Sequence, residues 1–214
     1  MPKRTLIEHR PWLLLSLASA IGYFALVDSP VGGLFVVALK GMSAGALAIY
    51  ALRRRVGASG TLLAIVMALG ALGDVAMDLW GESIGGPVFL AGHLVAIALY
   101  LRHRRPNPAR TQTLAGAALL LGTPIAAWLL SGSFAVGLYG LGLGAMAGSA
   151  WISRFGRYRV GLGAVLFVAS DLLIFARMGG VLPQAVTAWL VWPLYYAGQL
   201  LIATGVISKL RAKN

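Results

Sequence analysis

The chain has 214 residues, of which 59% are hydrophobic and 11% are charged, with 28 glycines and no cysteine. A soluble domain has about 45–50% apolar and about 25% charged residues, so the composition excludes a water-soluble globular domain and predicts an integral membrane protein. Without cysteine there are no disulfides, cysteine-bound metals or thiol nucleophiles. The net charge of +12 does not indicate a nucleic-acid partner, because the basic residues are not gathered on one solvated face.

Apolar stretches bounded by charged residues, glycine or proline predict eight membrane-spanning helices. A helix needs roughly 20 apolar residues to cross a hydrocarbon core about 30 Å thick, so eight helices leave only short connections. We therefore expect one all-α transmembrane domain over residues 1–214, without an added soluble domain. The expected spans are 12–28, 31–52, 61–80, 85–101, 112–130, 134–152, 160–176 and 185–208.

The first apolar stretch has a second interpretation. Basic residues precede the run 13–27, and Ala18-Ser19-Ala20 within it resembles a signal-peptide cleavage site. A signal peptide is therefore the alternative to an uncleaved first helix, which fits equally well because seven further spans follow.

Basic residues lie on alternate connections between the spans, which predicts the topology. Short cytoplasmic loops collect Lys and Arg, so the pattern places both termini in the cytoplasm, in the inner membrane if the source is bacterial. The same rim is suited to attract anionic head groups. Sixteen of the 18 basic residues follow the pattern: Lys3, Arg4, Arg10, Arg53, Arg54, Arg55, Arg102, Arg104, Arg105, Arg110, Arg154, Arg157, Arg159, Lys209, Arg211 and Lys213.

Two parts of the chain resemble each other. Residues 91–96 (AGHLVA) in the fourth span are similar to residues 197–202 (AGQLLI) in the eighth, and the preceding spans contain Gly73-Asp74 and Ser170-Asp171. Since the third and seventh spans run in the same direction, we expect a parallel four-plus-four repeat that relates the two aspartates by a pseudo-twofold axis. Chance similarity in a low-complexity apolar sequence is the alternative.

The sixth span carries a stripe of small residues. Gly140, Gly144 and Gly148 recur every four residues, which permits close approach of another helix. We interpret the stripe as internal packing in preference to a dimer face.

Polar residues inside the predicted spans fall in one layer. At about 1.5 Å of rise per residue, Asp74, Asp171, His93, Lys40 and Tyr195 lie about 8–15 Å from the non-cytoplasmic ends of their spans. Each charged residue at such depth costs about 2.5–3.5 kcal/mol or more, and it usually faces a bundle interior or a wet cavity. The layer therefore predicts a buried pocket that opens toward the non-cytoplasmic leaflet.

Asp74 and Asp171 are the strongest candidates for chemistry. The alternative is a structural role, as a hydrogen-bonded pair or as ion-pair partners of Lys40, but apolar side chains would fix helix packing at lower cost. Asp78 follows Asp74 by four residues and therefore lies on the same helix face, although it is nearer the membrane–water interface. For Lys40 a counter-ion role suffices, and His93 on an apolar helix is either a structural group or a functional one.

Known metal and nucleophile motifs do not occur. A zinc site typically needs two or three His or Cys ligands, whereas the spans offer His93 and some carboxylates. The sequence has no H-E-x-x-H, G-x-S-x-G, P-loop or dinucleotide fingerprint. We expect no cofactor and no metal. The carboxyl groups of Asp74 and Asp171 are then the best candidates for catalytic groups.

A set of residues from the second span to the eighth carries a family resemblance. It comprises Lys40, Gly73-Asp74, Phe89-x-x-Gly92-His93 with Tyr100, Gly163-x-x-x-Phe167-x-x-Ser170-Asp171 and Tyr195-Tyr196-x-x-Gln199. In order and spacing these residues resemble the lysoplasmalogenase family of YhhN-like membrane proteins. One departure concerns the residue after the membrane lysine, which is often proline in the family and is Gly41 here. The charge is retained, but the local helix kink is not expected.

The resemblance implies a multi-pass hydrolase that cleaves the vinyl ether bond of a lysoplasmalogen to a fatty aldehyde and glycerophosphoethanolamine or glycerophosphocholine. This hydrolysis needs a proton donor and a base, as paired carboxylates supply at glycosidic bonds. We therefore expect Asp74 and Asp171 to be the acid/base pair, with Lys40 influencing which of them holds the proton. The groups expected to support the reaction or to bind substrate are Lys40, Asp78, His93, Tyr195, Tyr196 and Gln199, with Arg177 as a candidate phosphate contact.

Two other classes of function compete with a hydrolase. A proton-coupled transporter or carrier of a small amphiphile also has intramembrane Asp, Lys and His residues and a parallel repeat. A non-catalytic lipid-binding or scaffold protein is the third class, and it would tolerate neutral replacement of both aspartates. For the hydrolase, the expected partners are the lipid bilayer and an ether-lipid or lysophospholipid substrate, with no nucleic acid and the oligomeric state left open.

Overall fold

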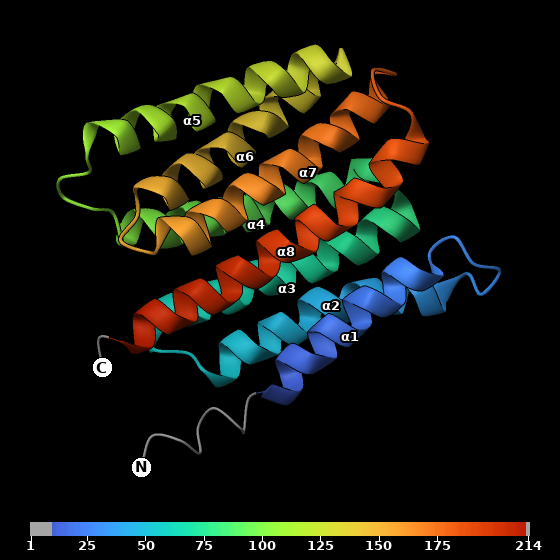
Figure 1. Ribbon diagram of the computed structural model, residues 1–214, viewed down its shortest axis with the longest axis horizontal. Helices are drawn as coiled ribbons and strands as arrows, with labels where there is room; N and C mark the ends of the chain where they lie inside the picture. The colour runs from blue at the N-terminus through green and yellow to red at the C-terminus, as the bar shows by residue number, and fades with distance from the viewer. Residues whose placement is uncertain (1–9, 213–214) are drawn as a thin grey trace. The chain divides into compact units, whose positions relative to one another are not determined.

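A computed structural model describes residues 10–212, which form eight α-helices (Figure 1). The helices confirm the predicted all-α architecture, and their ends lie within four residues of the expected spans. A π-helical turn, η2 (Arg157–Gly161), leads into the seventh helix. In chain order the helices are α1 (Arg10–Leu26), α2 (Leu34–Arg53), α3 (Gly57–Trp80), α4 (Glu82–Arg102), α5 (Arg110–Ser131), α6 (Phe134–Ile152), α7 (Leu162–Met178) and α8 (Gln184–Arg211).

Seven of these helices, α2 to α8, are long and apolar enough to cross a membrane, with α7 counted together with η2. Helix α1 is apolar too but shorter, with 17 residues. Large apolar side chains such as Leu72, Leu94 and Leu129 are exposed on the outer faces of the helices, where lipid tails replace water as the solvent. The chain is therefore an integral, multi-pass membrane protein.

The chain divides into two compact units. The first consists of α1, α2, α3 and α4 as far as Val95, joined by the chain from Leu210 onward. The second runs from Ala96 to Lys209 and contains the end of α4, then α5, α6, η2, α7 and most of α8. Each unit brings together helices that follow one another in sequence (Figure 1).

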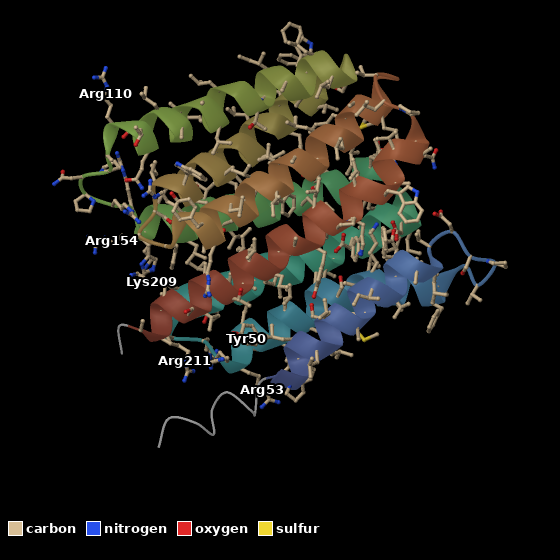
Figure 2. All side chains as sticks on the ribbon, viewed as in Figure 1. Tyr50, Arg53, Arg110, Arg154, Lys209 and Arg211 are labelled. Carbon is tan, nitrogen blue, oxygen red and sulfur yellow. The ribbon has the colours of Figure 1, made fainter. Side chains whose placement is uncertain are left out.

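Two arginine-rich connections meet in the second unit. The backbone N–H of Arg105 donates to the carbonyl of Ile152, and that of Arg154 donates to the carbonyl of His103 at 2.7 Å. These bonds join the connection after α4 to the connection after α6, at one end of the unit. Arg110, Arg154 and Lys209 all lie at that end (Figure 2), as expected if alternate connections lie on one side of the membrane.

The glycine stripe of α6 packs inside the second unit, as the four-residue spacing predicts. A Cβ atom at Gly144 would lie 2.6 Å from the carbonyl oxygen of Leu119 on α5, and one at Gly148 would lie 2.7 Å from that of Gly116. Both neighbours are backbone atoms, which cannot rotate away as a side chain can. Because glycine has no side chain, α5 and α6 can come into close contact at these positions.

In each unit, a glycine lies where one helix packs on the helix that carries the buried aspartate. In the first, a Cβ atom at Gly92 on α4 would lie 3.4 Å from Leu69 and 3.9 Å from the carbonyl oxygen of Val66, eight residues before Asp74. In the second, a Cβ atom at Gly198 on α8 would lie 2.7 Å from the carbonyl oxygen of Gly163, eight residues before Asp171. The matched crossings agree with the four-plus-four repeat expected from the sequence.

The stripe can be tested with a matched pair of alanine substitutions. We expect Gly144→Ala to lower the free energy of unfolding by about 1–3 kcal/mol, the usual cost of overpacking. Gly122→Ala on α5 is the control, because nothing lies within 4 Å of its Cβ position. Replacing a helical glycine by alanine in open space raises the free energy of unfolding by about 0.4–1 kcal/mol. Reversible unfolding in mixed detergent micelles measures both. Equal stabilities of the two variants would contradict the close contact.

Candidate functional site

The first unit buries Asp74, which lies six residues before the end of α3. Asp74 lies on α3 with 3% of its surface exposed. A Cβ atom on the preceding Gly73 would lie 2.9 Å from the ring of Phe89 on α4, so the missing side chain lets that ring pack directly on α3. One helical turn beyond Phe89, His93 is buried on the same helix. Asp74 and His93 thus belong to one unit and to adjacent, closely packed helices.

Lys40 of α2 provides the positive charge beside this helix. Its Nζ lies 2.5 Å from Oδ1 of Asp78 in an ion pair whose two side chains are partly buried. Lys40 also interacts electrostatically with Asp74 and Tyr23, and its Nζ lies 5.5 Å from the centre of the Tyr23 ring on α1. Asp78, which the sequence placed near the interface, is therefore the direct partner of the membrane lysine.

The α2 helix is held at this position by hydroxyl groups from two helices. Ser43 donates to the carbonyl of Lys40 at 2.6 Å, and Ser16 of α1 donates to the carbonyl of Ser43 at the same distance. The chain of bonds ties α1 to the turn of α2 that carries the lysine. The turn of α2 that carries Lys40 is thereby anchored to α1.

The second unit buries Asp171 among hydroxyl groups. Asp171 lies on α7 with 7% of its surface exposed. The Tyr139 hydroxyl of α6 donates to its Oδ2 at 3.0 Å. The Ser170 hydroxyl approaches Oδ1 at 3.4 Å, but its shorter bond, at 2.7 Å, goes to the carbonyl of Phe167. Tyr139 is therefore the principal hydrogen-bond donor to Asp171 within this unit.

Aromatic side chains from α7 and α8 form a second polar and aromatic group in this unit. The Gln199 amide donates to the Tyr195 hydroxyl at 3.1 Å. The Tyr195 ring meets Phe167 edge to face, with centroids 5.1 Å apart, and Trp192 stacks on Tyr196 at 6.2 Å. All four aromatic residues are buried. The structure thus brings Tyr195 and Gln199 together, and it places Trp192 beside Tyr196.

Three contacts were missed by sequence reasoning: those of Tyr23, Tyr139 and Trp192. All three residues lie in apolar runs without a charged neighbour, so the sequence around them does not indicate a polar contact. Tyr139 shares one sequence feature with Lys40, because each is followed directly by a glycine. Arg177, the candidate phosphate contact, lies partly exposed in the last turn of α7.

Residues 10–212 contain no group of three His, Cys, Asp or Glu side chains close enough to hold a metal ion together. The polar clusters described above are instead a lysine with carboxylates in the first unit and hydroxyls with a carboxylate in the second. Such clusters are suited to holding, donating or accepting protons.

The fold and these clusters define a class: a multi-pass helical membrane protein with a buried aspartate in each of two units. The profile of the YhhN family matches residues 35–206, and the chain belongs to the YhhN family. The match covers the helices that carry Lys40, both aspartates and Tyr195, and it confirms the predicted resemblance to this family. Comparisons with curated proteins and with solved structures found no significant match.

The ion pair of the first unit can be tested by a double-mutant cycle. We expect Lys40→Met to destabilise the protein, because it leaves Asp78 without its partner. Asp78→Asn should restore part of that loss in the double variant, with a coupling energy of about 0.5–3 kcal/mol. Unfolding of the wild type, both single variants and the double variant in mixed micelles gives this energy. Additive effects of the two substitutions would show that the pair is not coupled.

Proposed function

We propose that this protein hydrolyses the vinyl ether bond of a lysoplasmalogen, releasing a fatty aldehyde and glycerophosphoethanolamine or glycerophosphocholine. The observation that carries the proposal is membership of the YhhN family, which includes lysoplasmalogenases. A buried aspartate in each unit supports it, because acid/base hydrolysis of an ether needs two proton-transferring groups. We place the protein in the inner membrane if its source is bacterial.

The reaction begins with proton transfer to carbon. One aspartate gives its proton to the alkene carbon that is not bonded to oxygen, and the oxygen-bearing alkene carbon becomes the centre of an oxocarbenium ion stabilised by the ether oxygen. Water adds to this cation while the second aspartate takes a proton from it, which yields a hemiacetal. This division of labour matches that of the two carboxyl groups in glycosidases.

The second half of the reaction restores both aspartates. The hemiacetal hydroxyl returns a proton to the first aspartate, and the second aspartate protonates the departing glycerol oxygen as the carbon–oxygen bond breaks. One water is consumed, and the products are the aldehyde and the glycerophospholipid head. Asp74 and Asp171 are the two groups in this proposal.

The remaining polar residues are assigned supporting roles. Lys40 and Asp78 set the charge around Asp74, since an ammonium beside a carboxyl group stabilises its ionised form. His93, Tyr195, Tyr196 and Gln199 orient water or the glycerol oxygens, and Arg177 contacts the phosphate. A substrate with one apolar chain and one polar head suits a polar layer within an apolar helical protein.

Aldehyde release from a defined lysoplasmalogen by the purified protein in detergent tests the proposal. We expect wild-type turnover, and a loss of about 10²–10⁴-fold in kcat in Asp74→Asn and in Asp171→Asn, the usual range for a removed acid or base. Asp28→Asn is the matched control, because Asp28 is exposed in the connection after α1. Thermal unfolding verifies that each variant is folded.

Two arms of the same experiment separate the alternatives. A chelator arm measures the metal requirement directly, and retained turnover supports chemistry by the carboxylates alone. A folded wild-type protein that releases no aldehyde would overturn the proposal and favour a carrier, which flux or charge movement in liposomes without change in the lipid would then reveal. Full turnover in both Asn variants would reject the aspartates as acid and base.

A further inference from the structure

Tyr139 of α6 and Lys40 of α2 both lie near the starts of their helices. Lys40 is the seventh residue of α2 (Leu34–Arg53), and Tyr139 is the sixth residue of α6 (Phe134–Ile152). Each is followed directly by a glycine, Gly41 or Gly140. Helices α2 and α6 therefore each carry a polar side chain in their second turn.

The two side chains also contact equivalent positions on the neighbouring helix. Lys40 pairs with Asp78 and interacts electrostatically with Asp74 one turn earlier. Tyr139 donates to Asp171, and its ring packs edge to face on Phe175 one turn later, with centroids 5.8 Å apart. In both units a polar group from the second helix thus reaches the aspartate face of the third. Only the chemistry differs, since one group is an ammonium and the other a neutral hydroxyl.

We propose that Tyr139 is a positioning residue for Asp171, the counterpart of Lys40 in the other unit. The inference rests on the proposed hydrolysis and adds to it a residue outside the family motif that drew attention to the site. The geometry indicates what the Tyr139 hydroxyl does to the Asp171 carboxyl group. By donating to Oδ2 at 3.0 Å it fixes the rotation of the carboxyl group, and it leaves Oδ1, which has only the longer contact with Ser170, to exchange the proton.

The contact with Phe175 lets the hydroxyl be removed without disturbing the packing. In Tyr139→Phe the ring stays against Phe175 and only the oxygen is lost. A residue that acts merely by filling space is insensitive to this change, whereas one that orients a reacting carboxyl group is not. Misplacement of a reacting group by about 1 Å can lower the rate about 100-fold.

The test measures turnover of a lysoplasmalogen by full-length wild type, Tyr139→Phe, Asp171→Asn and the double variant, with Tyr158→Phe as control. Tyr158 is an exposed tyrosine of η2, so loss of its hydroxyl should leave activity unchanged. We expect Tyr139→Phe to lower kcat about 10- to 100-fold, with KM and the thermal midpoint near those of wild type. The double variant should be no slower than Asp171→Asn alone, because both changes act through one carboxyl group.

An infrared measurement reads the contact without using turnover. The carboxyl band of Asp171 is assigned by its loss in Asp171→Asn, and it should shift in Tyr139→Phe but not in Tyr158→Phe. An unshifted band, or a wild-type kcat in Tyr139→Phe when wild type is active, would overturn the role of Tyr139 alone. Absence of aldehyde release by folded wild type would instead overturn the proposed reaction, whatever the infrared band shows.

Discussion

A carboxyl group inside a helical membrane protein needs polar partners from neighbouring helices, and this constraint organises both units. Apolar lipid offers no hydrogen bonds, so an isolated charge at this depth is costly. In the first unit, the partner is the ammonium group of Lys40 on α2, which lies beside the aspartates of α3. In the second unit, the partners of Asp171 are the hydroxyl groups of Tyr139 and Ser170. Lys40 and Tyr139 reach across from a neighbouring helix, whereas Ser170 lies next to Asp171 on α7 itself.

Such contacts require helices to approach closely, and glycine makes the approach possible where side chains would prevent it. Gly198 lets α8 approach the backbone of α7 eight residues before Asp171. Gly73 does the same for the Phe89 ring directly beside Asp74. Without a hydrophobic driving force between helices in lipid, packing of this kind and interhelical hydrogen bonds supply the association energy. The polar clusters and the glycine crossings are therefore parts of one arrangement.

The helices and the strongest site candidates could be predicted from the sequence because their signals are local. Apolar runs of about 20 residues identify the spans, and a charged residue such as Asp74 or Lys40 stands out within such a run. The pairing of Lys40 with Asp78 could not be predicted, since it depends on the rotation of α2 against α3. Tyr139 was missed for a related reason: a tyrosine in a glycine-rich span looks apolar until the neighbouring helix brings a carboxyl group within 3.0 Å.

The surroundings of the two aspartates differ in a way that suits the proposed reaction. An acid/base pair works when its carboxyl groups differ in affinity for a proton, and an exact duplication would make them alike. Here the position that faces the aspartate carries Lys40 in one unit and Tyr139 in the other, and the position one turn after the aspartate carries Asp78 in one and Phe175 in the other. A charged environment around one aspartate and a hydroxyl environment around the other break the equivalence. On the proposed reaction, divergence at these two positions is what turns a duplicated structural unit into a catalytic pair.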